Sequence, residues 1–245
     1  MNRYSGPTAV IIGASSGIGE ALARQLNREG WRLGLLARRL DRLEAIRQTL
    51  APETVVRRFD VTDDAAATIL EDVLDEFGGV DLVVISAGTG HPNRDLNAEL
   101  DVDTVTVNVL GFMKTAQVAM RHFLRRGRGH LVGISSIAAL RGNREGAAYA
   151  ASKAFQSVYL DGLRDLARQS RLPIAVTEVQ PGFVDTAMMK TERPLPTVAR
   201  WLLVSSPAEA ARQIVRAVRK RAKHAYITRR YWLAALILKL LPRPG

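Results

Sequence analysis

Short apolar runs alternate with longer amphipathic stretches along most of the chain. The short runs are rich in β-branched residues, and several are followed at once by glycine, serine or aspartate, which is typical of buried strands. We predict strands at residues 8–12, 31–37, 54–59, 80–85, 130–134, 174–179 and 225–228. Between them we predict helices that end near residues 29, 50, 77, 126, 170 and 223. This alternation predicts an α/β fold: a doubly wound sheet of about seven parallel strands with helices on both faces.

The predicted elements form one continuous unit. The chain has no linker, low-complexity segment or internal repeat, so residues 1–228 are predicted to be a single domain. Residues 229–245 are predicted to be a tail with an amphipathic helix after Arg229 and Arg230. The residues that share its apolar face are Trp232, Leu233, Leu236, Ile237, Leu240 and Leu241. This helix could pack on its own domain or on a second subunit, or it could lie in a membrane interface. It is too short to span a bilayer, which takes ~20 residues.

Composition narrows the possible partners. The formal net charge is +11, but the arginines are spread over several predicted helices without a recognition motif, so we predict no nucleic-acid partner. The chain has no cysteine, and its four histidines lack ligand spacing, which predicts no metal site. The first residues lack a signal-peptide layout. We therefore predict a cytoplasmic protein, with peripheral membrane contact through residues 229–241 as the alternative.

A glycine-rich turn follows the first predicted strand and opens a helix. A dinucleotide-binding turn requires this context, because glycines let the backbone approach the phosphates and the helix N-terminus attracts their charge. An ordinary glycine-rich turn is the alternative. The candidate cofactor residues in this turn are Gly13, Ser15, Ser16, Gly17, Ile18 and Gly19.

Two arginines, Arg38 and Arg39, follow the second predicted strand, where such folds meet the adenosine ribose. An acidic residue there would favour NAD, whereas guanidinium groups suit a 2′-phosphate, so we predict NADP(H) over NAD(H). Alternatively, one or both arginines only begin the next helix. After the third strand, Asp60 could bond the adenine amine, or the cluster with Thr62 and Asp63 could cap the following helix.

Tyr149 and Lys153 lie four residues apart, on one face of a predicted helix. A free phenol ionises near pH ~10, too high for ready proton exchange at neutrality. A neighbouring ammonium favours the phenolate, so we expect Lys153 to lower the pKa of Tyr149 and make it a usable acid and base. A surface helix that happens to carry both residues is the alternative.

Several separated motifs occur in a familiar order and spacing. They are the glycine turn, Asp60, Ser86-Ala87-Gly88, Asn108, Ser136, Tyr149 with Lys153, and Pro181-Gly182. Over residues 8–228 the chain thereby resembles the short-chain dehydrogenase/reductase family. The resemblance implies a Rossmann-like fold, with Tyr149 as general acid and Lys153 on the nicotinamide ribose. It also implies that Ser136 holds the substrate oxygen, and that Asn108 anchors a water that relays protons to the lysine.

The resemblance also implies the remaining contacts and the function. Further cofactor residues are Val61, Ala87, Gly88, Pro181, Gly182, Val184 and Thr186. The implied function is an NADP(H)-dependent oxidoreductase that interconverts a carbonyl and a secondary alcohol, as a homodimer or homotetramer. The segment 186–206 reads as a lid, and its apolar residues, including Met188 and Trp201, favour an apolar substrate. The alternatives are a non-catalytic NADP-binding sensor and a basic membrane-surface protein on the same fold.

Overall fold

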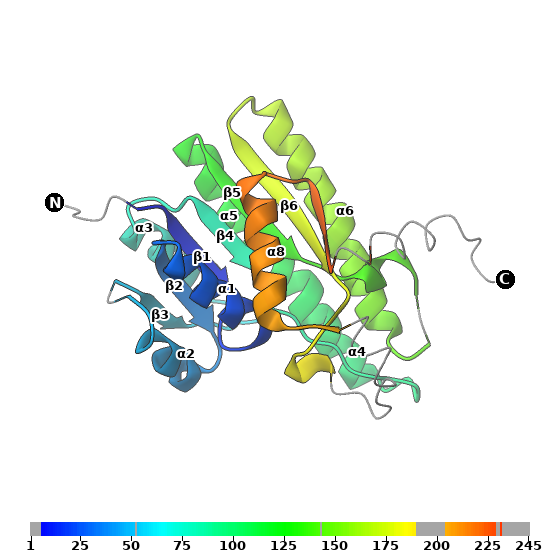
Figure 1. The fold of residues 1–245 in the computed structure, drawn as a ribbon. Coiled ribbons are helices and arrows are strands. Elements are labelled where there is room, and N and C mark those ends of the chain that lie inside the picture. The colour runs from blue at the N-terminus through cyan, green and yellow to red at the C-terminus, as the bar shows by residue number, and fades with distance from the viewer. Residues whose placement is uncertain (1–5, 52, 143, 190–203, 229–230, 232–245) are drawn as a thin grey trace.

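A computed structural model of the chain describes residues 6–51, 53–142, 144–189, 204–228 and 231. Within them a seven-stranded parallel sheet has the order β3-β2-β1-β4-β5-β6-β9 (Figure 1). Its strands are β1 (Thr8–Ile12), β2 (Arg32–Ala37), β3 (Val55–Arg58), β4 (Leu82–Ile85), β5 (Gly129–Ile134), β6 (Ile174–Pro181) and β9 (His224–Ile227). The predicted α/β class and parallel sheet are confirmed. β7 (Phe183–Val184) and β8 (Val204–Ser205) form a separate two-stranded pair.

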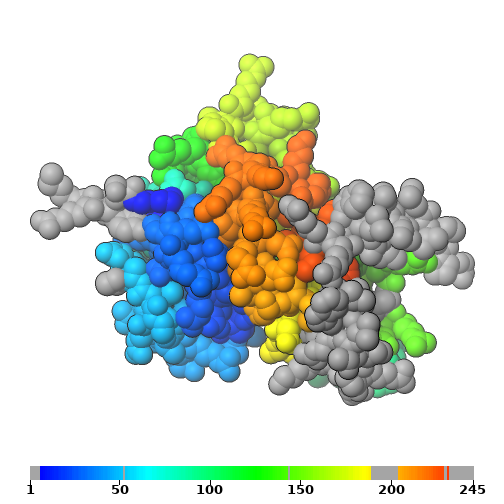
Figure 2. Space-filling view, in the orientation of Figure 1, coloured from blue at the N-terminus to red at the C-terminus, as the bar shows by residue number. Residues whose placement is uncertain are grey.

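Helices cover both faces of the sheet. The helices are α1 (Gly17–Arg28), α2 (Leu40–Arg47), α3 (Ala66–Glu76), α4 (Ala98–Val105), α5 (Phe112–Arg126), α6 (Ala147–Gln169) and α8 (Pro207–Arg219). Buried residues of α1, α2 and α8 form one core with the sheet, and those of α3, α5 and α6 form a second core on the opposite face. Helices α1 and α8 lie side by side on the first face (Figures 1 and 2). Strands covered on both sides are expected to be apolar throughout, as β4 is and as β1 is after Thr8.

The helix predicted over residues 97–126 is interrupted. Asn97 caps α4 by accepting a bond from the amide of Glu99, as its residue type favours. A π-helical segment, η1 (Thr106–Gly111), then joins α4 to α5. Such segments are rare and redirect the carbonyl groups of a helix. Here η1 contains Asn108, so the irregular backbone lies at a predicted site residue.

Two local expectations change. The predicted cap of α3 by Thr62 or Asp63 is wrong, because the helix begins after Ala65, whose side chain caps nothing. Asp63 instead accepts a bond from the amide of Ala65, in a turn that precedes the helix. The predicted lid is described only at its ends, including the 3₁₀-helical turn η3 (Ala187–Met189). Its residues 190–203, and residues 232–245 of the predicted tail helix, lie outside the described residues.

None of the helices described by the structure has the length and apolar character needed to cross a membrane.

Candidate active site

A cavity of about 710 Å³ opens at the carboxyl ends of the strands, next to β1 and β4. The strand order reverses between these two strands, and in open α/β sheets this switch point is where ligands bind. The walls contain all the predicted site residues except Gly19 and Asn108, which lie beneath the surface. The lining residues that we predicted are Gly13, Ser15, Ser16, Gly17, Ile18, Arg38, Arg39, Asp60, Val61, Ala87, Gly88, Ser136, Tyr149, Lys153, Pro181, Gly182, Val184 and Thr186.

The glycine turn allows β1 and α1 to meet closely at one end of the cavity. Gly13 has φ +87°, and a Cβ there would lie 2.5 Å from the amide nitrogen of Ala87. A Cβ on Gly19 would collide with the main-chain oxygen of Gly13. Gly19 therefore acts as a spacer beneath the turn and does not line the cavity. The first turn of α1 faces the cavity with Gly17 and Ile18, so its free amides and positive dipole end suit a phosphate.

Both predicted arginines line the same end of the cavity, but they are held differently. Arg39 donates from Nη2 to the hydroxyls of Ser15 at 3.0 Å and Ser16 at 2.8 Å. Arg39 thus braces the glycine turn. Arg38 is exposed and also faces the cavity. Arg39 occupies the N-cap position of α2, as the alternative interpretation from the sequence expected. Both arginines nevertheless also line the cavity, so beginning the helix does not account for them fully.

Asp60 lies on the cavity wall and also serves a local turn. Its Oδ1 accepts bonds from the amide of Thr62 at 3.0 Å and from the Thr62 hydroxyl at 2.9 Å. The local role that we considered from the sequence is thus present, as a turn before α3 instead of a helix cap. Neighbouring Val61 is buried against Gly111 of η1.

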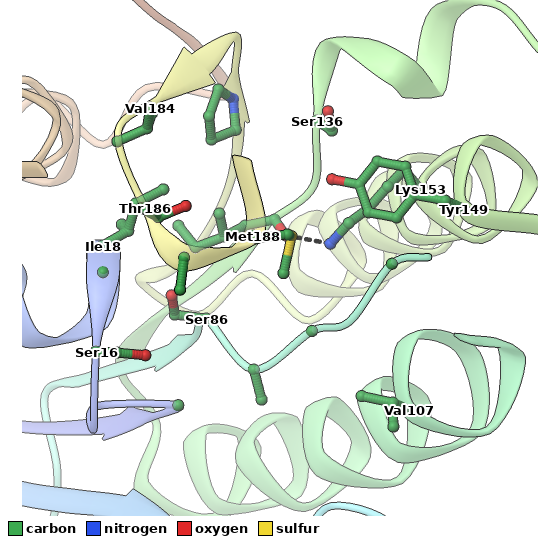
Figure 3. Close-up of a pocket in the computed structure, with 18 of the residues that line it drawn as sticks. Ser16, Ile18, Ser86, Val107, Ser136, Tyr149, Lys153, Val184, Thr186 and Met188 are labelled. Atoms are coloured by element: carbon green, nitrogen blue, oxygen red, sulfur yellow. Dashed lines mark hydrogen bonds between the residues drawn. The ribbon is translucent and has the colours of Figure 1, made fainter. Parts of the chain in front are cut away.

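The predicted catalytic side chains gather at the other end of the cavity. Tyr149 lies in the first turn of α6. Ser136 lies two residues after the end of β5, where it caps the 3₁₀-helical turn η2 (Ile137–Leu140) (Figure 3). The Ser136 hydroxyl accepts a bond from the amide of Ala138 at 3.1 Å, which fixes its position. A hydrogen bond also joins Ser136 to the Tyr149 phenol. A carbonyl oxygen that reaches this end of the cavity would meet two hydroxyl groups.

The pKa of Tyr149 departs from the sequence-based expectation. Burial raises the pKa of the phenol, and its hydrogen bond with Ser136 offsets part of that rise. The predicted lowering of this pKa by Lys153 is therefore wrong for the structure described here. The Lys153 ammonium lies 5.7 Å from the centre of the Tyr149 ring, and its described bonds go to other partners. A raised pKa keeps the phenol protonated at neutral pH, as a proton donor requires.

Lys153 is buried beneath Tyr149. Its Nζ donates to the main-chain oxygen of Ile134 at 3.1 Å, and to Oε1 of Gln156 at 3.0 Å (Figure 3 draws the bond to Ile134). Burial lowers the pKa of Lys153 to about 8. A cation that is partly ionised near neutrality can change its charge during a reaction.

Asn108 is fully buried in η1 and fastens the loop after β4. Its Nδ2 donates to the carbonyl of Thr89 at 2.7 Å and to the hydroxyl of Ser152 at 3.0 Å. Its Oδ1 accepts from the amide of Thr89 at 2.9 Å. The described bonds of this side chain are thus structural, and its main-chain carbonyl is linked to Lys153 through Gln156.

Comparison with known proteins places this geometry in a family. Residues 7–196 match the family model of short chain dehydrogenases. An uncharacterised oxidoreductase of Myxococcus xanthus (strain DK1622) is 38% identical over 203 residues, covering 80% of this chain and 79% of the relative. This chain belongs to the short-chain dehydrogenase/reductase family. It is therefore an oxidoreductase of that family, which confirms the resemblance stated from the sequence.

Solved structures show the same fold. A short-chain dehydrogenase/reductase from Burkholderia phymatum, in complex with NAD, is 23% identical with a TM-score of 0.82, covering 100% of this chain and 99% of that one. A short-chain dehydrogenase from Sphingobium yanoikuyae, in complex with NADPH, is 24% identical with a TM-score of 0.81, covering 98% of each chain. One of these structures holds NAD and the other NADPH, so the fold accommodates both nucleotides.

Two buried polar residues of this short-chain dehydrogenase were not predicted from its sequence. Gln156 is fully buried between Lys153 and Asn108, and Ser152 bonds both Asn108 and the main-chain oxygen of Tyr149. The sequence did offer a signal for them. Gln156 lies three residues after Lys153 and Ser152 one residue before it, and polar side chains that are buried beside a lysine on a helix need hydrogen-bond partners.

Tyr231, the described residue of the predicted tail, packs on the wall of the dehydrogenase cavity. Tyr231 is buried, and its ring lies so close to Gly182 that any Cβ there would collide with it. Its ring meets Phe183 edge to face at 6.4 Å between centroids. The segment 181–186, expected against the nicotinamide, is thus held from behind by residue 231.

Proposed function

We propose that this enzyme is an NADP(H)-dependent oxidoreductase that interconverts a carbonyl and a secondary alcohol, with Tyr149 as the general acid and base. The observation that carries the proposal is the convergence of Ser136, Tyr149 and buried Lys153 on one end of a cavity whose other end suits a dinucleotide. The glycine turn supports the fit, since Gly13 and Gly19 allow the close backbone packing that forms the turn, and Gly17 and Ile18 present the N-terminus of α1 to the cavity.

The chain's own residues supply position, polarity and the proton. The cofactor, when bound, supplies or accepts the hydride. In the reduction direction, the Ser136 hydroxyl and the Tyr149 phenol hold the carbonyl oxygen, where negative charge develops as the carbon is reduced. Tyr149 then donates its proton to that oxygen, and the Lys153 ammonium beneath the ring stabilises the phenolate that forms. Oxidation of an alcohol reverses these steps.

We propose NADP(H) in preference to NAD(H). Arg38 and Arg39 end β2 on the cavity wall, and no acidic residue occupies the position that bonds a ribose 2′-hydroxyl. Arg39 is already engaged with Ser15 and Ser16. Arg38 is therefore the better candidate for the 2′-phosphate, and Arg39 positions the turn.

We propose an apolar substrate. Around the catalytic end, the cavity is lined by Val107, Ile137, Phe183 and Met188. These side chains offer apolar surface that a hydrophobic ketone or alcohol would cover. Steroid, lipid, polyketide and small xenobiotic carbonyls fit this description. A screen of NADPH oxidation across these carbonyl classes tests it, and exclusive turnover of charged carbonyls would refute it.

Replacing Tyr149 with phenylalanine tests the proposed chemistry. The variant keeps the ring and loses the proton, so turnover of a carbonyl substrate should fall by about 10²–10⁴-fold. NADPH binding, followed by fluorescence, should stay close to that of the parent, because the phenol lies at the far end of the cavity from the glycine turn (Figure 3). Parent-like turnover by Tyr149→Phe would refute the mechanism.

A non-catalytic NADP-binding sensor is the second candidate, because one fold can serve different functions. Nucleotide binding without turnover over the whole carbonyl panel would favour it. The combination of a protonated phenol and a buried ammonium argues for chemistry instead.

We also propose that the enzyme is a cytoplasmic homodimer or homotetramer, with one domain over residues 1–228. The contact of Tyr231 with Phe183 supports a tail that starts on its own domain. Peripheral membrane contact through residues 229–241 is the alternative. Flotation with anionic liposomes at low and high salt separates the two, since surface attraction of a basic tail weakens with salt.

A further inference from the structure

Gln156 occupies a fully buried position between two parts of the site. Its Oε1 accepts from Nζ of Lys153 at 3.0 Å, and its Nε2 donates to the main-chain oxygen of Asn108 at 2.9 Å. The orientation of the amide is fixed by its partners. The Lys153 ammonium can only donate and the Asn108 carbonyl can only accept, so only one arrangement satisfies both. A flipped amide would place its NH₂ group against the Lys153 ammonium, donor against donor, and its oxygen against the Asn108 carbonyl, acceptor against acceptor.

The backbone irregularity in η1 is coupled to this contact. Asn108 lies in the π-helical segment, and its carbonyl accepts the bond from Gln156 on α6. The Asn108 side chain meanwhile holds Thr89 and Ser152. The side chain of Asn108 thus holds the loop after β4, and its main-chain carbonyl holds the carboxamide of Gln156 beside Lys153.

We propose that Gln156 is a positioning residue of the reaction, which ties the Lys153 ammonium to the Asn108 carbonyl and thereby holds a positive charge beneath Tyr149. The proposal rests on the function proposed above and adds a residue to it. It also limits the route of the proton. An amide oxygen and a peptide carbonyl do not take up a proton at neutral pH, so a proton that leaves Lys153 cannot pass through Gln156 to Asn108.

The electrostatic consequence has a definite sign. A hydrogen bond to the charged form favours that form, so the Gln156 carbonyl opposes the burial that lowers the pKa of Lys153 to about 8. Removing this acceptor should lower that pKa further. Replacing it with a carboxylate should raise the pKa, because an opposite charge favours the ammonium.

Among the described residues, Gln156 is the side chain that accepts a hydrogen bond from the Lys153 ammonium. From α6, the titratable group that faces the amine is Tyr149; from β5 the partner is the main-chain oxygen of Ile134. The loop after β4 presents Gly88, where a Cβ would lie 3.4 Å from Nζ. The buried carboxylate of Glu178 on β6 is engaged instead by Ser135, Gln180 and His224.

Two substitutions of similar size test the proposal with opposite expected signs. The readout is the ¹³C NMR titration of the lysine ε-carbons in the enzyme without nucleotide, with Lys153 assigned by its loss in Lys153→Arg. In Gln156→Met the midpoint of Lys153 should move to lower pH by about one unit, and in Gln156→Glu to higher pH by at least as much. Gln169→Met, at an exposed glutamine of the same helix, should leave the midpoint unchanged.

Turnover gives the second readout. In the reduction direction the alkaline limb of the kcat profile should follow the Lys153 midpoint, downward in Gln156→Met and upward in Gln156→Glu. Because a midpoint moved from about 8 to about 7 reduces the ammonium fraction about twofold at pH 7 and about tenfold at pH 9, kcat of Gln156→Met should fall by these factors, with little change in KM for the carbonyl. Thermal unfolding and NADPH binding establish that each variant is folded.

Unchanged midpoints in both variants, or shifts in the same direction, would overturn the proposal, because a merely structural glutamine has no reason to act with opposite signs. The NMR titration does not require turnover. If the parent enzyme reduced no carbonyl while the midpoints still moved in opposite directions, the proposed function would fail and the role of Gln156 in holding the lysine charge would stand.

Discussion

At the scale of single residues, the site combines a phenol that burial keeps protonated with an amine that burial makes easier to deprotonate. Burial penalises the charged form of each group, so it raises the pKa of Tyr149 and lowers that of Lys153 to about 8. The two pKa values therefore cross and move apart, so that the Lys153 ammonium becomes a stronger acid than the Tyr149 phenol. At neutral pH the phenol is consequently held as a proton donor, above an amine whose charge can change.

Arg38→Asp tests the choice of nucleotide. The substitution puts a carboxylate where a 2′-phosphate would lie, so kcat/KM for NADPH should fall by about 10²-fold or more, through charge repulsion and a lost bidentate contact. The same carboxylate can accept a bond from a ribose 2′-hydroxyl, so NADH use should hold or rise. Steady-state kinetics with both nucleotides measure the ratio.

The control for Arg38→Asp is Arg42→Asp, which makes the same charge change on exposed α2, outside the cavity lining. Arg42→Asp should change kcat/KM for NADPH and for NADH only slightly, and by the same factor. Equal losses for NADPH and NADH in Arg38→Asp would contradict the NADP assignment.

Residue spacing was enough to place Tyr149 and Lys153 on one face of a helix, because that face follows from the period of the α-helix alone. The direction of the Tyr149 pKa could not be predicted in the same way. It depends on how completely β5, η1 and the loop after β4 cover the phenol, and the local sequence does not contain that cover. Gln156 escaped prediction for the same reason, since its partners are 3 and 48 residues away along the chain.

At the scale of elements, the strands were predictable and the irregular joints were not. Continuous β-branched runs mark strands that are covered on both faces, and the predicted order is confirmed for the seven strands of the main sheet, whereas the short strands β7 and β8 were not predicted. The π-helical segment leaves no comparable pattern, because it extends a helix by a single wider turn that tertiary contacts select. The start of α3 was missed because Asp60, Thr62 and Asp63 satisfy turns before the helix begins.

His130 on β5 bonds Thr177 on β6, and Thr177 in turn bonds the segment before β9. The Thr177 hydroxyl donates to the carbonyl of Ala222 at 2.5 Å, so Nε2 of His130 must donate to Thr177 at 2.8 Å, which fixes the ring nitrogen that carries the proton. Burial, with a smaller effect of the Arg221 charge, lowers the pKa of His130 to about 4. Folding therefore favours the uncharged ring.

Acid should destabilise the fold through this histidine. The pKa of His130 in the folded protein lies below its unfolded value of about 6.5. The contribution of His130 to the free energy of unfolding is therefore fully present above pH ~6.5 and is lost as the pH falls toward 4. The loss amounts to about 3 kcal/mol at most. His130→Gln keeps a donor for Thr177 and removes the titration, so its free energy of unfolding should fall less between pH 7.5 and 4.5 than that of the parent. Urea unfolding at both pH values measures the difference. His91→Gln, at a half-buried histidine whose ring bonds Asp103, should lose as much stability in acid as the parent does; an equal acid loss in His130→Gln would contradict the argument.

At the scale of the whole molecule, the cavity exists because the chain reverses direction across the sheet between β1 and β4. The first half of the chain brings the glycine turn and the arginines to this point, and the second half brings Ser136, Tyr149 and Lys153. The two ends of the site therefore come from opposite halves of the sequence, which explains why the family motifs are so widely separated along the chain. A parallel sheet imposes this arrangement, because every strand presents its carboxyl end at the same edge.

An exposed apolar surface on α4, η1 and α6 bears on the proposed homo-oligomer. The exposed fraction is 62% for Val102, 46% for Leu110 and 72% for Val158, and α4 packs against both η1 and α6. Large apolar side chains exposed on elements that pack together are candidates for cover by a partner. The same elements carry Asn108 and Tyr149 on their inner faces, so a second copy docked there would stiffen the site from outside.

Val102→Glu combined with Val158→Glu should separate the subunits. Two buried carboxylates would have to lose their hydration in the interface, so the dissociation constant should rise by about 10²-fold or more. Light scattering after size-exclusion chromatography at micromolar concentration should show a dimer or tetramer for the parent and a monomer for the variant. Leu40→Glu, a similar exposed apolar position on α2, should leave the assembly intact. A monomeric parent, or a variant that assembles as the parent does, would contradict the assignment of this surface, whereas a monomer with weakened turnover would tie the assembly to the site beneath it.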